Sequence, residues 1–253
     1  MNVTRILLII CCFGLTAACV SDRPDGPEGA SPERAVIYNV QLGMQYLQQG
    51  RRDLARLRLE RALEIDDRSP EANSAIAFYW EQIGEIERAD ESHRLAVRYG
   101  NRNPNIANNY GTFLCQQQRY EESEDYFLRA ARSREYRTPA AAYTNAGACQ
   151  RRAADPVRAE ELLRRALTID PTFVDALWHL AELSFEQGDP LSARAFLQRL
   201  EAQGQLSASM LYLCVGIERA MGDDQTADDY ARRLVRNFPN SEQARRLGAG
   251  GGR

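Results

Sequence analysis

The chain has 253 residues, a formal net charge of −3 and a hydrophobic fraction of 44%. A chain of this length can bury a sizeable core. The mildly acidic balance gives no basis for binding nucleic acid, so we expect no nucleic acid among its partners.

The first 18 residues are typical of a bacterial lipoprotein signal peptide that ends before Cys19. Arg5 supplies a short basic start, residues 6–15 are mostly apolar, and Thr16, Ala17 and Ala18 precede the cysteine. An apolar run this short does not span a bilayer, which needs about 20 residues. We therefore expect cleavage and lipidation of Cys19; a plain secretory signal that is cut near Ala18 is the alternative.

The residues that follow the cysteine indicate where the anchor would lie. Val20 stands where many inner-membrane lipoproteins have Asp, which favours the outer membrane with the protein facing the periplasm. Several acyl chains give stable anchoring where one chain does not. The Pro- and Gly-rich residues 19–34 predict a flexible tether, and the Gly-rich residues 244–253 predict a disordered tail.

Between these ends, residues 35–243 repeat with a period of 34 residues, which is the length of a tetratricopeptide (TPR) repeat. Small residues recur at fixed places, and the first three units have Gly43, Ala55 and Ala62, then Ala77, Ala89 and Ala96, then Gly111, Ser123 and Ala130. Small side chains let two antiparallel helices approach closely, and stacked helical pairs share one core. The sequence therefore predicts an all-α, right-handed superhelical solenoid of about six TPR hairpins.

One interval between units is longer than the others. The last small residue of one unit and the first of the next are 15 residues apart in three intervals. Ala130 and Gly147 are 17 residues apart. We therefore expect a longer loop near residues 131–139, between a three-repeat N-terminal half and a three-repeat C-terminal half.

Three cysteines remain after those of the leader and Cys19, namely Cys115, Cys149 and Cys214. An odd number is unusual in an oxidising compartment. A disulfide between Cys115 and Cys149 is conceivable because both fall on first helices of neighbouring repeats. The alternative is three small buried thiols.

A segment of the third unit is more specific than the general repeat pattern. Residues 108–122 read NNYGTFLCQQQRYEE, and this string resembles the third repeat of the type IV pilus biogenesis lipoproteins PilW and PilF. The leader, the tether, the six units and the length fit the same family. The resemblance implies a pilotin without catalytic activity, which helps the pilus secretin to reach the outer membrane and form a multimer there. An adaptor for periplasmic cell-wall enzymes is the alternative function.

A partner would bind on the first helices of the repeats, which line the concave face of a solenoid. The N-terminal positions expected there are apolar, which often marks a partner site, and they are Ile37, Val40, Met44, Leu47 and Phe78. The middle positions are polar and suited to a peptide backbone, and they are Asn108, Thr112 and Gln116. In the alternative interpretation the tether covers the apolar patch, or its side chains only cap the core, and the polar groove is merely solvated.

The chain has little with which to carry out catalysis. Of its two histidines, His93 falls on a packing position of a second helix, and His179 has no Cys or second His at ligand spacing. No nucleophile elbow or phosphate-binding loop is present. We therefore expect no catalytic residues, no metal, no cofactor and no small-molecule substrate.

Overall fold

The computed structural model describes residues 31–250, with side chains described up to residue 248. The predicted signal peptide, Cys19 and most of the predicted tether lie outside these residues. The described chain contains thirteen helices and no strand. The helices are α1 (Pro32–Gln48), α2 (Arg52–Ile65), α3 (Pro70–Ile83), α4 (Ile86–Tyr99), α5 (Pro104–Gln116), α6 (Tyr120–Arg132), α7 (Pro139–Arg152), α8 (Pro156–Ile169), α9 (Val174–Glu186), α10 (Pro190–Glu201), α11 (Ala208–Ala220), α12 (Asp224–Asn237) and α13 (Glu242–Gly250).

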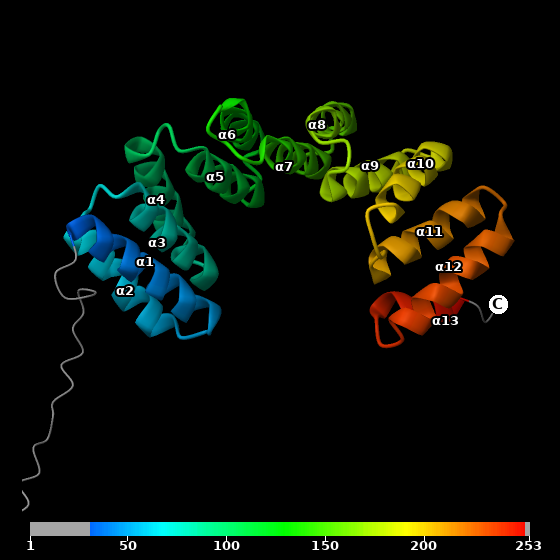
Figure 1. Ribbon diagram of the computed structural model, residues 1–253, viewed down its shortest axis with the longest axis horizontal. Helices are drawn as coiled ribbons and strands as arrows, with labels where there is room; N and C mark the ends of the chain where they lie inside the picture. Colours follow the sequence, from blue (N-terminus) through cyan, green and yellow to red (C-terminus); the bar gives the residue numbers. More distant parts are fainter. Residues whose placement is uncertain (1–30, 251–253) are drawn as a thin grey trace, which may run out of the picture.

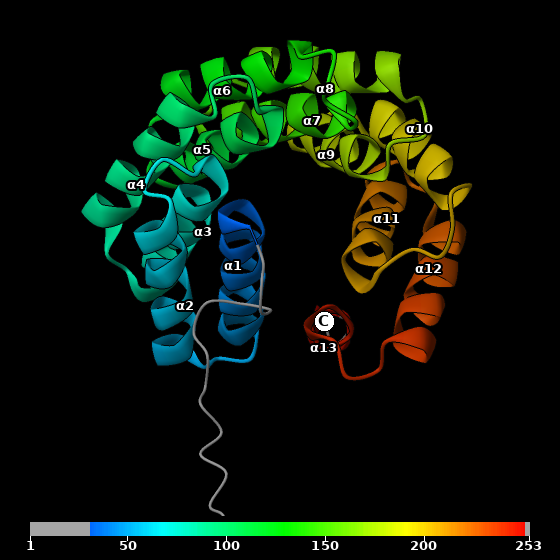
Figure 2. The ribbon, with the colours of Figure 1, turned by 60° about the vertical axis from the view of Figure 1, so that its left-hand side comes forward.

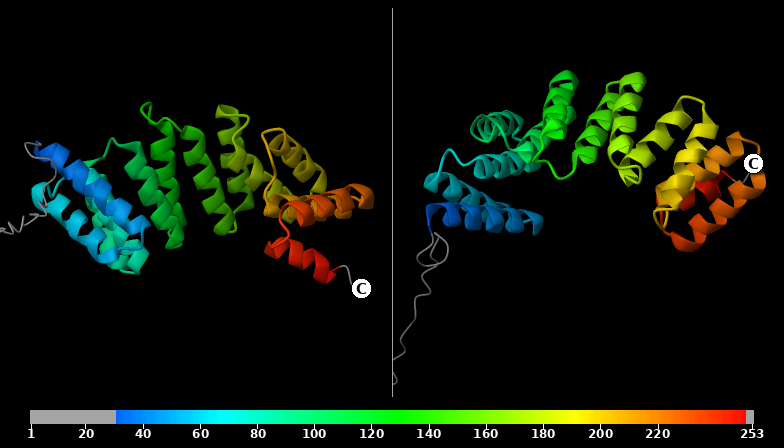
Figure 3. Two further views of the ribbon diagram at one scale, coloured as in Figure 1. Left: turned by 60° about the horizontal axis from the view of Figure 1, so that its bottom comes forward. Right: turned by 45° about the horizontal axis from the view of Figure 1, so that its top comes forward.

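The first twelve helices form six antiparallel hairpins that stack in chain order into an open arc (Figures 1 and 2). The first helix of each hairpin lies on the inner side of the arc and the second on the outer side (Figure 2). The last helix, α13, packs against α11 and α12 at the C-terminal end (Figure 3). The prediction of an all-α TPR solenoid is confirmed. Among the described helices, none combines the length and the apolar character that crossing a membrane requires.

Local sequence signals explain where the helices begin. Proline occupies the first turn of six of them, where it lacks an amide that the helix does not use. Side chains of Ser31, Ser69 and Asp155 accept hydrogen bonds from backbone amides of the first turn. The repeat boundaries are therefore specified by residues that recur with the period.

Small residues at the crossing of each hairpin allow the close packing. A Cβ atom added at Gly111 would lie 2.9 Å from Cδ1 of Phe127, which is below any ordinary contact. Ala55 and Ala62 are fully buried against the facing helix in the first hairpin. The period of small residues therefore reflects the distance between the paired helices.

The predicted boundaries need two corrections. Helix α1 begins at Pro32, capped by Ser31, so residues 32–34 belong to the solenoid and not to the tether. The predicted disordered tail is wrong for residues 244–250, because they belong to α13. Ala244 is buried and Leu247 packs against the C-terminal core, so this short helix covers apolar surface that the last hairpin would otherwise expose.

The longer loop is present between α6 and α7, at residues 133–138. A second loop of similar length, residues 202–207, separates α10 from α11 because α10 ends early at Glu201. The repeat period alone did not indicate this second loop.

The cysteines divide into a bridge and a free thiol. Cys115 of α5 and Cys149 of α7 form a disulfide, with Cα atoms 5.9 Å apart. The alternative of three separate thiols therefore does not hold. Cys214 is free and buried, and burial raises its pKa to about 12, so this thiol stays neutral.

Candidate functional site

A pocket of about 550 Å³ opens on the concave face between α1, α3 and α5. Helix α4 contributes the floor through His93. We call it the N-terminal groove. Its lining residues are Met44, Glu71, Ser74, Ala75, Phe78, Glu81, His93, Asn103, Asn105, Ile106, Asn109, Thr112 and Gln116.

One part of the groove is apolar. Met44, Ala75, Phe78 and Ile106 line it from three different helices. The Phe78 ring is 40% exposed even though it belongs to a helix whose other large side chains are mostly buried. An exposed aromatic ring inside a concave pocket is a common anchor point for a partner.

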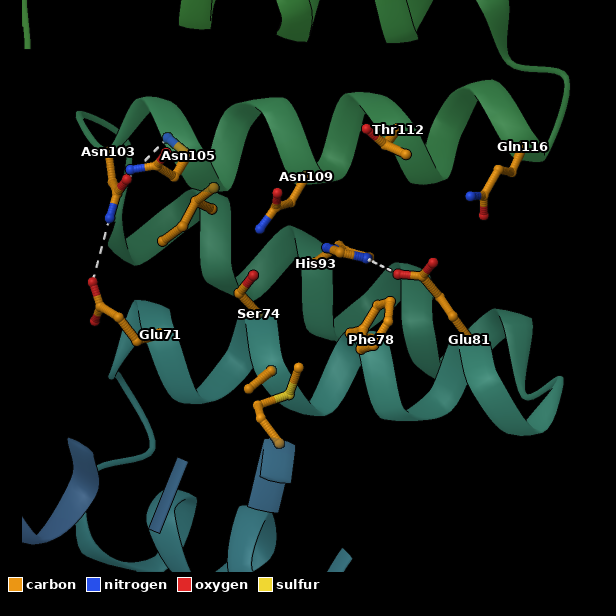
Figure 4. A pocket seen from close by; sticks show the side chains of 13 residues that line it. Glu71, Ser74, Phe78, Glu81, His93, Asn103, Asn105, Asn109, Thr112 and Gln116 are labelled. Carbon is orange, nitrogen blue, oxygen red and sulfur yellow. Dashed lines mark hydrogen bonds and ion pairs between the residues drawn. The ribbon is translucent and has the colours of Figure 1, made fainter. Parts of the chain in front are cut away.

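The rest of the groove is polar and has a negative formal charge. Glu71 and Glu81 contribute carboxylates at its two ends, and the lining contains no Arg or Lys. The side-chain amides of Asn105, Asn109 and Gln116 project from α5 on the opposite side (Figure 4). Such a lining suits hydrogen bonds to a peptide and disfavours an anionic ligand.

A buried histidine supports one of the carboxylates. His93 is 2% exposed, and its Nε2–H donates to Glu81 Oε1 at 2.6 Å (Figure 4). The other ring nitrogen, Nδ1, is buried without a hydrogen-bond partner. The ring packs on Tyr110 and Phe113, with centroid distances of 5.4 and 5.0 Å. These contacts hold the imidazole in place, and the imidazole in turn fixes the rotamer of Glu81.

Side chains of the segment 108–122 pack under His93, which forms the floor of the groove. Tyr110 stacks on His93, and its hydroxyl donates to Asp90 Oδ1 at 2.8 Å. Burial raises the pKa of the Tyr110 phenol, which keeps it protonated as a donor. Gly111 makes room for Phe127, and its carbonyl accepts from Ser123 Oγ at 2.7 Å. The residues of this string therefore position α5 beside α4 and α6.

Comparison with known proteins agrees with this architecture. Family models described as tetratricopeptide repeat match residues 104–172, 151–214 and 217–241. The type IV pilus assembly protein PilF of Pseudomonas aeruginosa is 30% identical over 244 residues, which cover 95% of this chain and 96% of that protein. The chain belongs to the PilF/PilW family. It is a TPR protein of type IV pilus biogenesis.

Other relatives of the family are similar in sequence or structure. A structure of P. aeruginosa PilF superposes with a TM-score of 0.72 at 29% identity, and covers 87% of this chain and 99% of that one. The crystal structure of PilW, described as a widely conserved type IV pilus biogenesis factor, gives 0.75 at 30% identity, over 85% and 98% of the two chains. An uncharacterised Haemophilus influenzae protein is 33% identical over 53% of this chain and 73% of its own length. The likeness to PilF and PilW thus extends over almost the whole solenoid.

The structure brings together four of the eight residues expected to bind a partner. Met44, Phe78, Thr112 and Gln116 line the N-terminal groove of this PilF/PilW-family chain. The other four are outside it, and they are Ile37, Val40, Leu47 and Asn108. Ile37 is 52% exposed on α1, so the groove represents only part of the predicted apolar patch.

Three of the residues outside the groove have other contacts. Val40 and Leu47 are half-buried and pack against the N-terminal core. Asn108 is half-buried, and its Oδ1 accepts from Asn145 Nδ2 at 3.1 Å across to α7. Val40 and Leu47 therefore contribute to the N-terminal core, and Asn108 links α5 to α7.

Sequence reasoning missed several residues of the groove, and a helical spacing would have found most of them. On α5 the polar lining positions are 105, 109, 112 and 116, which follow one face of a helix at four- and three-residue steps, and Ile106 lines the groove beside them. Choosing Asn108 in place of Asn109 shifted the phase by one residue. Asn103 belongs to a loop and His93 to a second helix, so a rule confined to first helices could not include them.

The remaining predictions concern metals and the anchor. Among residues 31–248, no three His, Cys, Asp or Glu side chains are grouped closely enough to hold a metal ion. His93 lies in the interior, as its packing position predicts. Cys19 lies outside the described residues, so its lipidation stays a prediction.

Proposed function

We infer that the protein is an outer-membrane lipoprotein pilotin, which binds the type IV pilus secretin and promotes its localisation and multimerisation in the outer membrane. The observation that carries this proposal is the open N-terminal groove in a member of the PilF/PilW family. The groove combines an exposed aromatic anchor with free side-chain amides, and this combination suits a protein segment.

The fold supports a role in holding another protein. A TPR array presents a long concave surface, and proteins of this repeat class act as interaction scaffolds. Lipidation at Cys19 would place the array at the periplasmic surface of the outer membrane, next to the site where the secretin ring assembles. The protein would act there by binding secretin subunits while they insert.

Secretin multimers in a deletion strain test this function. Secretin rings that resist detergent run as a high-mass species on a gel, so their amount can be measured directly. We expect this species to fall sharply without the protein and to return when the wild-type gene is supplied. Multimers at the wild-type level in the deletion strain would contradict the pilotin role.

A Cys19→Ala variant tests the anchor separately. We expect the variant to leave the outer-membrane fraction and to appear as soluble protein in the periplasm, while its solenoid still captures secretin in solution. A variant that still co-sediments with outer membranes would show that acylation of Cys19 is not the anchor.

A further inference from the structure

The two carboxylates at the ends of the N-terminal groove have different surroundings. Glu71 is exposed, and one of its oxygens accepts from Asn103 Nδ2 at 3.3 Å. The side chain of Glu81 is only 13% exposed, and Oε1 is taken by His93. Its second oxygen has no hydrogen-bond or ion-pair partner among the described residues. A hydrogen bond from a cationic donor to this oxygen would be stronger than one from a neutral donor.

The buried histidine gives a second, independent indication that the groove holds a ligand. His93 Nδ1 is buried without a partner, although buried polar atoms are normally hydrogen-bonded. In Figure 4 the ring lies between Glu81 and Asn109, with its free nitrogen on the side away from Glu81. The floor of the groove therefore has an unsatisfied polar atom beside the carboxylate.

The dimensions of the groove indicate the conformation of its occupant. Glu71 and Glu81 are ten residues apart on α3, which corresponds to about 15 Å along a helix. An extended segment covers this distance with four or five residues. On α5, Asn105 and Asn109 are one turn apart, or about 6 Å, which is close to the two-residue repeat of an extended backbone. The backbone groups of an α-helix are already paired, so free amides along the groove favour an extended occupant.

From these observations we propose that the N-terminal groove binds an extended segment of the partner protein that carries an apolar side chain followed or preceded, within about four residues, by a Lys or Arg. The apolar side chain packs between Met44, Phe78 and Ile106, and the cation pairs with the free oxygen of Glu81. The amides of Asn105 and Asn109 hydrogen-bond the backbone. This inference rests on the proposed function, because it specifies the part of the secretin that the pilotin recognises.

The lining of the groove disfavours two other kinds of occupant, an acidic segment and an amphipathic helix. An acidic segment would face two carboxylates with no arginine in the lining, and like charges brought together weaken binding. An amphipathic helix would leave the amides of α5 without backbone partners. His93 acts as a positioning residue, since its Nε2–H holds the carboxylate toward the groove.

The test uses the mature chain and peptides of twelve residues that tile the periplasmic part of the secretin from the same organism. Binding of each peptide is measured to the wild type, to Glu81→Gln and to the control Glu87→Gln. Glutamine keeps an oxygen that can accept from His93, so the fold of the first variant should be unchanged. Glu87 is exposed on α4 and outside the groove. Glu87→Gln therefore removes one negative charge, as Glu81→Gln does, without changing the groove.

We expect the peptides that bind to contain Lys or Arg near Leu, Ile, Met or Phe. Glu81→Gln should weaken them about tenfold or more, as for one partner of a buried charge pair, and Glu87→Gln should not. Replacing the Lys or Arg of a binding peptide with Gln should have the same effect, with no added loss in Glu81→Gln. Equal affinity for Glu81→Gln, or binding peptides without a cation, would overturn the proposal.

Capture of intact secretin by the wild type and by Glu81→Gln distinguishes a failure of this inference from a failure of the proposed function. If the wild type captures secretin but none of the peptides, or if Glu81→Gln captures it equally well, the extended cationic segment is wrong and the pilotin role stands. If the wild type does not capture secretin at all, both proposals fail.

Discussion

The two halves of the solenoid have the same backbone plan but different concave faces. In the N-terminal half, α1, α3 and α5 leave a groove of about 550 Å³ with an exposed phenylalanine and a free carboxylate oxygen. In the C-terminal half, the corresponding hollow between α9, α11 and α13 measures only about 240 Å³. Aromatic side chains line much of it, namely Trp178, Phe185 and Tyr212.

The glutamates on the concave face also have different partners in the two halves. At the start of the C-terminal half, Arg151 pairs with both Glu182 and Glu186 at 3.1 Å, and His179 contacts Glu182 at 3.2 Å. In the N-terminal groove, Glu81 has only His93 as a partner. The same helical positions therefore serve internal pairing in one half and leave a binding surface in the other.

The last helix adds to this difference. Helix α13 contributes Gln243 and Arg246 to the smaller hollow, and Gln243 donates to Ser209 Oγ at 3.1 Å. The N-terminal groove has no such cover among residues 31–248. The repeat therefore fixes where the helices run, whereas the side chains and the end cap decide which part of the concave face stays open.

The disulfide joins the two halves, so removing it should have the largest effect on stability. In Cys115→Ser combined with Cys149→Ser, the bridge that closes a 34-residue separation is lost. We expect a loss of about 3–4 kcal/mol in the free energy of unfolding. Because contacts in a repeat array are local, the reduced protein should unfold in two transitions instead of one.

Calorimetry of the oxidised, reduced and double-serine proteins measures this coupling. Cys214→Ala is the control, since it removes a thiol that forms no bridge and should leave a single transition. A double-serine protein with the same melting curve as the oxidised wild type would show that packing alone couples the halves.

Matched substitutions on the two concave faces test which half binds the partner. Phe78→Glu puts a charge into the apolar part of the N-terminal groove, whereas Tyr212→Glu does so in the C-terminal hollow, at a ring of similar exposure. We expect Phe78→Glu to raise the Kd for secretin roughly 30- to 100-fold, as for a central anchor residue. Tyr212→Glu should change it by about twofold at most, as at a non-anchor position.

Both variants should keep their helical circular dichroism, because Phe78 and Tyr212 are 40% and 36% exposed and neither belongs to the fully buried core. If Tyr212→Glu weakens capture more than Phe78→Glu, the binding surface is in the C-terminal half and the larger N-terminal groove is not the partner site.

Two glycines on first helices differ in what an added side chain would meet: Gly111 faces Phe127 of its own hairpin, whereas Gly216 faces Phe185 of the preceding repeat. A Cβ at Gly111 would meet the Phe127 ring at 2.9 Å, whereas a Cβ at Gly216 would lie 3.4 Å from Phe185. Gly111→Ala should therefore cost about 1–3 kcal/mol through overpacking. Gly216→Ala should be neutral or stabilise by up to about 1 kcal/mol, because alanine favours the helix. Chemical denaturation of both variants measures the difference, and equal effects would contradict it.

Much of the fold followed from the sequence because it depends on local, repeated signals. The small residues at hairpin crossings, such as Gly43 and Ala77, lie where the period places them. The structure of the C-terminal end was not predictable in this way. The glycines after Leu247 suggested disorder, but Ala244 and Leu247 find apolar surface on the last hairpin, and this tertiary contact outweighs the weak helix propensity of the glycines.

The groove was predictable only in part, because it depends on contacts between repeats. Met44 and Phe78 could be recognised as apolar side chains on an inner face. The role of His93 could not be recognised, since its effect comes from Glu81, which is 12 residues away on another helix. Asn108 looked available in the sequence, but its Oδ1 accepts a hydrogen bond from Asn145 of the next repeat.

The smallest expected effect concerns the turns within hairpins, which should respond alike in both halves. Gly84 and Gly222 have positive φ angles of 82° and 76°, but the same turn position has Gln118 at 61° and Ala154 at 59°. A residue with a Cβ atom is strained by about 1–2 kcal/mol in this conformation, and glycine loses part of that advantage through the entropy of the unfolded chain. Gln118→Gly and Ala154→Gly should therefore each stabilise the protein by about 0.5–1 kcal/mol. The reverse change Gly222→Ala should destabilise it by a similar amount. Denaturation midpoints measure all three, and a stabilisation in only one half would show that the backbone, and not only the side chains, differs between the two.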